Sequence, residues 1–181
     1  MIRIAQVEDI PAIYEIYCFY VEHGEALFDL RPQPFEAFQR MWKQQLAMYP
    51  AVVAERDGRV IGYAAAHPAF SKDAYQFCME LSIYFMPGDH FGLAGPLYEA
   101  LERFLIVQGC RWIVACITET NEASLRFHEA RGFVWSGALP ACGHKHGGWH
   151  GVVWYRKELN ADPKRWIPFS EVIALEAKRS D

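Results

Sequence analysis

The chain has 181 residues, of which 52% are hydrophobic and 22% charged, so it is long and apolar enough to fold as one globular domain. Its formal net charge of -4 gives no basis for nucleic acid or an anionic membrane as the main partner. No apolar run approaches the roughly 20 residues that a bilayer-spanning helix needs. The five cysteines contain no Cys-x-x-Cys pair, and with no apolar leader at the N-terminus they favour reduced thiols and a cytoplasmic location.

The first half of the chain is expected to hold four strands, two of them joined as a hairpin, and two helices. The spacing of apolar residues is helical in two segments and alternating in four. In chain order we expect a strand over 3–6, helices over 9–22 and 35–48, strands over 51–55 and 59–66, a loop over 67–72, and a long strand over 74–85. Asp57-Gly58 is typical of a hairpin turn, and Asp9 is the expected N-cap of the first helix.

The second half alternates between helices and strands, which favours an α/β chain with a mixed sheet and helices on its faces. Gly109 is expected to end a helix that runs to about residue 108. We then expect a strand over 112–117, a helix opened by 121–124, strands over 133–136 and 151–157 around a connection rich in His and Gly, and a short helix over 170–178 capped by Ser170.

A glycine-rich turn over residues 86–96 joins the expected strand 74–85 to the next helix. Its small residues Gly92, Ala94 and Gly95 would let backbone amides approach a ligand, and Pro96 suits the first turn of a helix. Free amides at a helix start favour an anion such as phosphate. A tight strand-to-helix connection is the other interpretation. The turn lacks the spacing of a Rossmann site and the Gly-Lys-Ser/Thr of a P-loop.

An ordered set of short segments resembles the GNAT acetyltransferase superfamily, and within it the phosphinothricin acetyltransferase-like group. The resemblance covers residues 2–159. It is carried by residues 2–5 and 9–13, Glu80 to Tyr84, residues 90–94 and 97–101, Asn121 to Leu125 with His128, Gly132-Phe133, and residues 145–150. It implies a GNAT fold, in which a central, mixed and largely antiparallel sheet is flanked by helices and a splayed strand pair binds acetyl-CoA.

The resemblance implies a cofactor site between the splayed strands and the two helix starts that follow. Pantetheine is expected to pair with backbone groups of the first strand, and the pyrophosphate to lie on the turn. The cofactor-binding residues are expected to be Ile83, Tyr84, Phe85, Phe91, Gly92, Leu93, Ala94, Gly95, Pro96, Asn121, Ser124 and Phe127. For Asn121 and Ser124 a plain N-cap of the next helix is the alternative.

The turn departs from the pattern of this superfamily in two positions. Asp89 stands where the superfamily has Arg or Gln, and Pro96 removes one amide donor. An acid beside a pyrophosphate is repelled by it unless its side chain points away. A non-catalytic acyl-CoA-binding protein is therefore an alternative function.

Two residues are expected to be catalytic, Glu80 and His128. Strand alternation places Glu80 on one face with Ser82 and Tyr84, and a carboxylate there can take a proton from the attacking amine. The resemblance also places Glu80 at the proposed base of the superfamily. His128 matches a histidine of the phosphinothricin-type pattern and would act as acid or through water. The alternatives are a solvated edge acid and a histidine packed beside the sheet.

The acceptor is expected to be a small amino-acid-like amine, such as phosphinothricin, methionine sulfone or methionine sulfoximine. The expected substrate-binding residues are Phe28, Phe35, Tyr75, Lys145, Trp149 and His150, with Lys72 and Arg31 as further cations for an acidic ligand. A cluster of Cys142, His144, His146 and His150 has metal-ligating residue types, but a hairpin need not bring them together, and no metal is expected. A protein N-terminal or lysine acetyltransferase is the alternative enzyme.

The catalytic domain is expected to span 1–159, followed by a C-terminal extension over 160–181 that contains a short helix. Relatives of this type often form homodimers. Trp154, Trp166 and Phe169 are the expected surface aromatic residues for such a contact.

Overall fold

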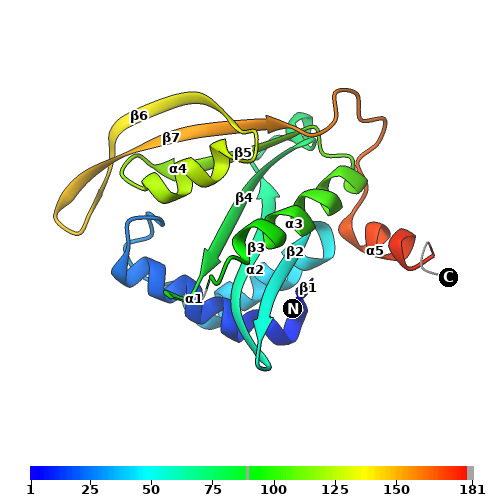
Figure 1. Cartoon of the computed structure of the whole chain (residues 1–181), viewed down its shortest axis with the longest axis horizontal. Coiled ribbons are helices and arrows are strands. Elements are labelled where there is room, and N and C mark those ends of the chain that lie inside the picture. The colour runs from blue at the N-terminus through cyan, green and yellow to red at the C-terminus, as the bar shows by residue number, and fades with distance from the viewer. Residues whose placement is uncertain (89, 179–181) are drawn as a thin grey trace.

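The computed structural model describes residues 1–88 and 90–178 and contains a seven-stranded mixed sheet with helices on both faces (Figure 1). The strand order is β1-β2-β3-β4-β5-β7-β6. The elements are β1 (Ile2–Ile4), α1 (Ile10–His23), α2 (Phe35–Met48), β2 (Ala51–Arg56), β3 (Arg59–Pro68), β4 (Cys78–Phe85), α3 (Ala94–Gln108), β5 (Trp112–Thr118), α4 (Glu122–Glu129), β6 (Val134–Lys145), β7 (Gly148–Glu158) and α5 (Phe169–Ala177). The expected architecture is confirmed.

The strands β4 and β5 form the parallel pair of an otherwise antiparallel sheet in the described chain. They pair only from Cys78 opposite Trp112 to Glu80 opposite Val114, although both strands continue beyond that point. β4 stays paired with β3 as far as Phe85, while β5 stays paired with β7 as far as Thr118. The two halves of the sheet therefore separate after Glu80, which confirms the splayed strand pair.

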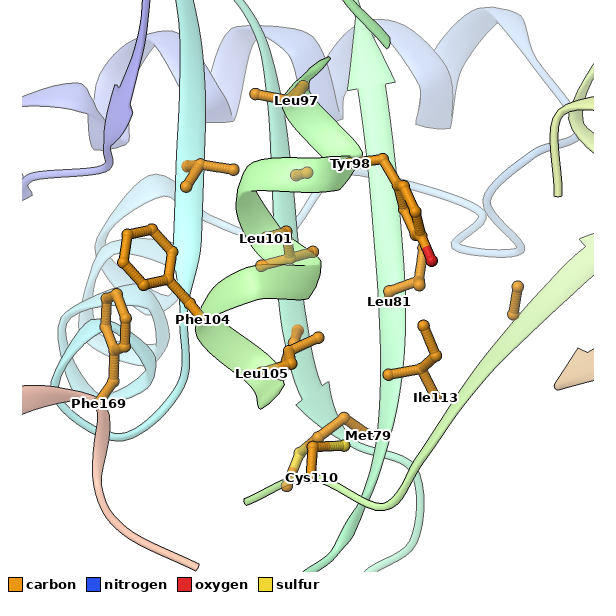
Figure 2. Close-up of a cluster of buried hydrophobic side chains, with 14 of the residues drawn as sticks. Met79, Leu81, Leu97, Tyr98, Leu101, Phe104, Leu105, Cys110, Ile113 and Phe169 are labelled. Atoms are coloured by element: carbon orange, nitrogen blue, oxygen red, sulfur yellow. The ribbon is translucent and has the colours of Figure 1, made fainter. Parts of the chain in front are cut away.

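One face of the sheet is covered by α3, which buries residues at i, i+4 and i+8. Leu97, Leu101 and Leu105 are fully buried and point toward β4 and its neighbours (Figure 2). Beside them the rings of Phe104 and Phe169 meet edge to face with centroids 5.3 Å apart. The helix α5 thus joins the core of the main sheet through Phe169.

The other face of the sheet is covered by α1 and α2. Their helical stripes bury Ile13 and Ile16 from α1 and Phe38 and Trp42 from α2 against strands β2 and β3. The same cluster includes Tyr84 of β4, whereas Leu81 and Phe85 lie in the cluster under α3. This alternation assigns Glu80, Ser82 and Tyr84 to the α1 and α2 face, as the sequence pattern predicts.

The segment before β4 is shorter as a strand than expected. β4 begins at Cys78, and Asp73–Tyr75 form one turn of 3-10 helix instead. The amides of Tyr75 and Gln76 donate to the carbonyls of Lys72 and Asp73, so these backbone groups are used locally and cannot enter a ladder.

The connection predicted over 137–150 is instead part of a long hairpin. β6 and β7 continue to Lys145 and Gly148 and extend well past the end of β5 (Figure 1). His146 and Gly147 form the turn with φ of 50° and 78°. This hairpin can be rich in Gly, His and Cys, because most positions of β6 are exposed to solvent and do not require an alternating apolar pattern.

Two expected helix caps and one expected surface residue differ in the structure. Asp9 precedes α1, but its carboxylate accepts from the Gln6 amide and from Arg3 and makes no cap bond to α1. α5 follows Pro168 and starts at Phe169, so Ser170 lies inside the helix. Phe169 is buried in the core rather than exposed for a partner, and Trp166 packs against the same core.

No helix among the described residues has the length and apolar character to span a membrane.

Candidate active site

The separation of β4 and β5 produces a cavity of about 120 Å³ between the two strands and the start of α4. It is lined by Tyr20, Ala26, Leu81, Ser82, Ile83, Tyr84, Ala115, Cys116, Ile117, Thr118, Asn121, Ser124 and His128. Five of the residues singled out in the sequence are thus brought to one place, namely Ile83, Tyr84, Asn121, Ser124 and His128.

The backbone of β4 offers unpaired groups to this cavity at alternate residues. Toward β3, the Met86 amide donates to the Ile61 carbonyl and the Cys78 carbonyl accepts from Ala69, which makes even-numbered residues the ones paired with β3. The amides and carbonyls of Ile83 and Phe85 therefore point toward the β5 side, although the Phe85 carbonyl already accepts a hydrogen bond from Oη of Tyr20 at 2.9 Å. Those of Tyr84 are paired with Tyr63, so its expected backbone contact with a cofactor is not available and only its side chain faces the cavity.

Asn121 fulfils the capping role, and it also lines the cavity. Its Oδ1 accepts from the Ser124 amide at 3.1 Å, which caps α4. The side chain of Phe127, one turn further, lies under the guanidinium of Arg131, whose central carbon is 3.6 Å from the ring centroid.

The glycine-rich turn leads directly into α3, which begins at Ala94. Phe91 and Gly92 have φ of 38° and 75°, and the Leu93 amide donates to the His90 carbonyl. Ala94, Gly95 and Pro96 form the first helical turn, where amides have no intrahelical partner and Pro costs no bond. Asp89, the unexpected acid of this turn, lies outside the described residues.

Glu80 lies where β4 and β5 begin to separate, half-buried and directly across from His67 of β3. Burial raises the pKa of its carboxyl, and the nearby charge of His67 opposes that effect. A raised pKa brings a carboxylate closer to the proton affinity that a general base needs near neutral pH.

His128 is buried in the lining of this cavity, and one of its ring nitrogens is used in a hydrogen bond. Its Nδ1 lies 2.8 Å from the Ser124 carbonyl, which requires Nδ1 to carry the hydrogen and donate it. Nε2 is buried and has no hydrogen-bond partner among the described residues. Burial lowers the pKa of His128, so the neutral ring with an accepting Nε2 dominates at neutral pH.

A second cavity of about 570 Å³ lies between the helices α1 and α2 and the strands β3 and β4. Ser82 and Tyr84 line both cavities, so the two meet at the even-numbered side chains of β4. The second is lined by Tyr17, Leu27, Asp29, Gln33, Phe38, Met41, Trp42, Gln44, Gln45, Met48, Tyr49, Tyr63, Ala65, His67, Pro68, Ser82 and Tyr84. Within the described chain this lining contains no Lys or Arg. Sequence reasoning missed this cavity because its aromatic residues carry the helical pattern of a core.

Three of the residues expected around a substrate gather on one side of the site, where the loop after α1 meets the β6–β7 hairpin. Lys145 is buried and donates from Nζ to the Leu27 carbonyl at 2.7 Å, and burial lowers its pKa. Phe28 packs on Gly143, and His150 contacts the carboxylate of Glu25 at 3.4 Å. These contacts hold the loop in place, and none of the three lines either cavity described above.

The other expected substrate residues lie apart from both cavities. Phe35 packs edge to face on Tyr14, Tyr75 packs on Phe70 at an exposed position, and Trp149 is exposed beside His144 on the hairpin. Lys72 borders a separate small cavity, and Arg31 is exposed. The residues Cys142, His144, His146 and His150 are spread along the hairpin, and no three His, Cys, Asp or Glu side chains of the described residues form a metal-binding group.

The sequence of the chain matches a known family. The sequence profile described as "Acetyltransferase (GNAT) domain" matches residues 2–154, and the chain belongs to this family. The separated parallel strand pair in the middle of its sheet agrees with that assignment.

Individual relatives are similar over nearly the full chain. The phosphinothricin N-acetyltransferase of Streptomyces viridochromogenes is 34% identical over 94% of this chain and 95% of its own. The L-methionine sulfoximine/L-methionine sulfone acetyltransferase of Salmonella typhimurium is 32% identical over 88% of this chain and 94% of its own. The crystal structure of a GNAT superfamily phosphinothricin acetyltransferase from Sinorhizobium meliloti in complex with acetyl-CoA superposes with a TM-score of 0.85, at 30% identity, and covers 93% of this chain and 92% of its own.

Proposed function

We propose that this chain is an acetyl-CoA-dependent N-acetyltransferase that acetylates the primary amine of a small amino-acid-like substrate. The observation that carries the proposal is the meeting of two cavities at Ser82 and Tyr84, one between the separated strands and one beneath α1 and α2. Such an arrangement brings a thioester and an amine together from opposite sides. Relatives named as phosphinothricin and methionine sulfoximine acetyltransferases, and a similar structure in complex with acetyl-CoA, support it.

The cofactor is proposed to lie in the gap, with pantetheine bonded to the free amide and carbonyl of Ile83 and to the amide of Phe85, whose carbonyl is used by Tyr20. Its pyrophosphate would lie against the turn and the first turn of α3, from Phe91 to Pro96, where unpaired amides favour an anion. The start of α4 would border the pantetheine through Asn121, Ser124 and Phe127.

Glu80 is proposed as the general base of the reaction. It takes one proton from the substrate ammonium, directly or through water, and the free amine attacks the thioester carbonyl. The C–N bond forms, the C–S bond breaks, and CoA leaves as a thiolate. His128 is proposed to relay the second amine proton to that thiolate, because Nε2 of the neutral ring is free to accept it.

The acceptor is proposed to occupy the 570 Å³ cavity. Its lining is largely aromatic and carries one carboxylate, Asp29, with His67 as the basic side chain and no Lys or Arg among the described lining residues. This observation favours a second candidate acceptor, an amine with an apolar or aromatic body and no second acidic group, over a doubly anionic one.

A thiol-release assay over a panel of amines tests the proposal. The panel contains phosphinothricin, methionine sulfone, phenylalanine, phenethylamine and a peptide with a free N-terminus. Turnover with any small amine supports the proposed N-acetyltransferase, and the ranking of the amines by kcat/KM identifies the preferred class of acceptor. Turnover with the peptide alone would favour a protein acetyltransferase, and acetyl-CoA binding without turnover would favour a binding protein.

We infer a cytoplasmic homodimer as the form in which the protein acts. Exposed apolar side chains gather on the β6–β7 hairpin at the edge of the sheet, namely Val134, Trp135, Leu139 and Trp149. An apolar edge strand is prone to pair with another chain. Sedimentation velocity of the wild type and of a Trp135→Ser variant tests this, and a monomeric wild type at micromolar concentration would exclude the dimer.

A further inference from the structure

A cation lies directly over the start of α3, although no Arg or Lys occurs in the turn before it. It comes from Arg131, just after α4 in the chain. A Cβ atom added to Gly95, the second residue of α3, would lie only 2.6 Å from Nη2 of Arg131. The guanidinium therefore contacts the backbone at the first turn of α3, and the absence of a side chain on Gly95 makes room for it.

Arg131 is held in this place by contacts that leave most of its donors unused. Nη1 donates to the Phe127 carbonyl at 3.2 Å, and the guanidinium lies over the Phe127 ring. Nε is buried without a hydrogen-bond partner among the described residues. No carboxylate of a described residue lies within ion-pair distance of Arg131, whereas neighbouring Lys157 is bound by Glu102.

Such a placement is unfavourable for the protein alone. The first turn of a helix carries a partial positive charge, and a cation beside it is repelled. An anion bound between the guanidinium and the helix start makes the interaction favourable, because the anion is attracted by the guanidinium and by the free amides together. The Phe127 ring limits the reorganisation needed, because it already fixes the plane of the guanidinium.

We propose that Arg131 binds the pyrophosphate of acetyl-CoA and supplies the cation that the glycine-rich turn lacks. The inference rests on the proposed function, since it takes acetyl-CoA as the ligand of this site. Arginine suits the role because its planar fork can donate two hydrogen bonds to one phosphate group. Such a role for Arg131 would supply, from elsewhere in the chain, the positive charge that the superfamily pattern has at the position of Asp89.

The test is calorimetric titration of acetyl-CoA into the wild type, Arg131→Met, Arg131→Lys and the matched control Arg126→Met. Arg126 carries the same charge and lies nearby in the sequence, on α4, but it is exposed and paired with Glu122. The Arg131→Met variant is expected to bind acetyl-CoA about 10- to 100-fold more weakly than the wild type, because it loses a charge-assisted contact with phosphate. Arg131→Lys should lose less, and Arg126→Met should bind like the wild type. Arg131→Gln replaces Arg131→Met if that variant fails to fold.

Shortened cofactors locate the contact. Acetyl-dephospho-CoA, which lacks only the 3′-phosphate, should show the same loss with Arg131→Met, and acetyl-pantetheine, which lacks the pyrophosphate, should show none in kcat/KM. Equal affinity of Arg131→Met and wild type for acetyl-CoA would overturn the inference alone. A loss that disappears with acetyl-dephospho-CoA would also overturn it, in favour of the 3′-phosphate. A wild type that does not bind acetyl-CoA would overturn the proposed function and this inference together.

Discussion

At the scale of single residues, the chemistry of the site depends on how far each charged side chain is removed from water. Glu80 is half-buried at the point where β4 and β5 separate, and its environment raises its pKa. His128 is more deeply buried, and the same loss of hydration lowers its pKa. Burial thus raises the proton affinity of the Glu80 carboxylate and lowers that of the His128 imidazole, which brings the pKa values of the two groups closer to each other.

Replacement of Glu80 by Gln tests the role of this carboxyl as a base. We expect kcat to fall roughly 10²- to 10⁴-fold with little change in acetyl-CoA affinity. In the wild type, kcat/KM should rise with pH as Glu80 loses its proton, with an apparent pKa above that of a free glutamate, and this limb should vanish in Glu80→Gln. Steady-state kinetics over pH 4–9 measures both. Unchanged turnover in the variant would remove Glu80 from the mechanism.

Asp9 and Arg3 form an ion pair that is expected to make folding sensitive to acid. Their closest atoms are 2.7 Å apart, with 8% of the Asp9 side chain and 29% of the Arg3 side chain exposed. Burial alone would raise the pKa of Asp9, but hydrogen bonds from Arg3 and from the Gln6 amide outweigh it and lower the pKa. The folded state therefore gains stability from the ionised form of Asp9. This stability is fully present above the pKa of Asp9 in the unfolded chain, and it is lost as pH falls through the lower pKa of Asp9 in the folded state.

Asp9→Ala is expected to reduce the free energy of unfolding by roughly 1–3 kcal/mol at neutral pH, because the carboxylate that accepts from Arg3 and from the Gln6 amide is lost, while Arg3 keeps Glu55 as a partner at 2.7 Å. The difference from the wild type should begin to shrink below about pH 4, where Asp9 of the unfolded chain becomes protonated, and should continue to shrink as pH falls through the lowered pKa of Asp9 in the folded state. Urea unfolding at pH 7 and pH 3 measures it. A difference that stays constant over this range would argue against the ionised pair as its source.

At the scale of elements, the loop over residues 24–34 is fixed to the sheet by polar contacts rather than by a secondary-structure ladder. Thr118 donates from Oγ1 to the Glu25 carbonyl, and Lys145 donates to the Leu27 carbonyl. Leu27 and Asp29 of this loop line the proposed acceptor cavity. The hairpin that carries Lys145 therefore positions one wall of that cavity.

Lys145→Met is expected to raise the KM of the acceptor several-fold while the affinity for acetyl-CoA stays unchanged. The variant leaves the Leu27 carbonyl without its donor, at a cost of about 1–3 kcal/mol that loosens the loop. Steady-state kinetics and calorimetry separate the two effects. Lys43→Met, which removes an exposed charge on α2, is the control. Equal losses for acceptor and cofactor would indicate a general loss of folding instead.

The elements with a strong pattern were predictable from the sequence. Helix α2 spans the expected residues, and Asp57-Gly58 forms the expected turn with φ of 50° and 75°. The ends of the β6–β7 hairpin were also predicted as strands, but its continuation through 137–150 was not, because an exposed edge strand carries no apolar alternation. The start of β4 was also misjudged, since hydrogen bonds local to the 3-10 turn outweighed the strand propensity of the segment.

At the scale of the whole molecule, α5 lies on the same core as the catalytic domain. Phe169 and Val172 are buried, and the Ile167 amide donates to the Gln108 carbonyl near the end of α3. The segment over 160–178 thus stabilises the helix whose first turn forms the proposed pyrophosphate site.

Phe169→Ala is expected to lower the free energy of unfolding by about 3–5 kcal/mol, since it leaves a cavity beside Phe104. Ile173→Ala, on the same helix at a position 39% exposed, should change it by less than about 1 kcal/mol. Thermal and urea unfolding of both variants measure the difference. Similar values for the two variants would show that α5 does not depend on Phe169 for its packing.

The sequence by itself determined the order of strands and helices, the glycine-rich turn, the capping of α4 by Asn121 and the face on which Glu80 lies, because each depends on local spacing. Only the tertiary structure decided that Arg131 lies over Gly95, that Phe38 and Trp42 line a cavity, and that Lys145 holds a loop. The contacts of Arg131 with Gly95 and of Lys145 with Leu27 join residues 36 and 118 positions apart, and the cavity depends on how helices pack against the sheet. Local pattern carries no record of such contacts, because they are set by the packing of elements in space.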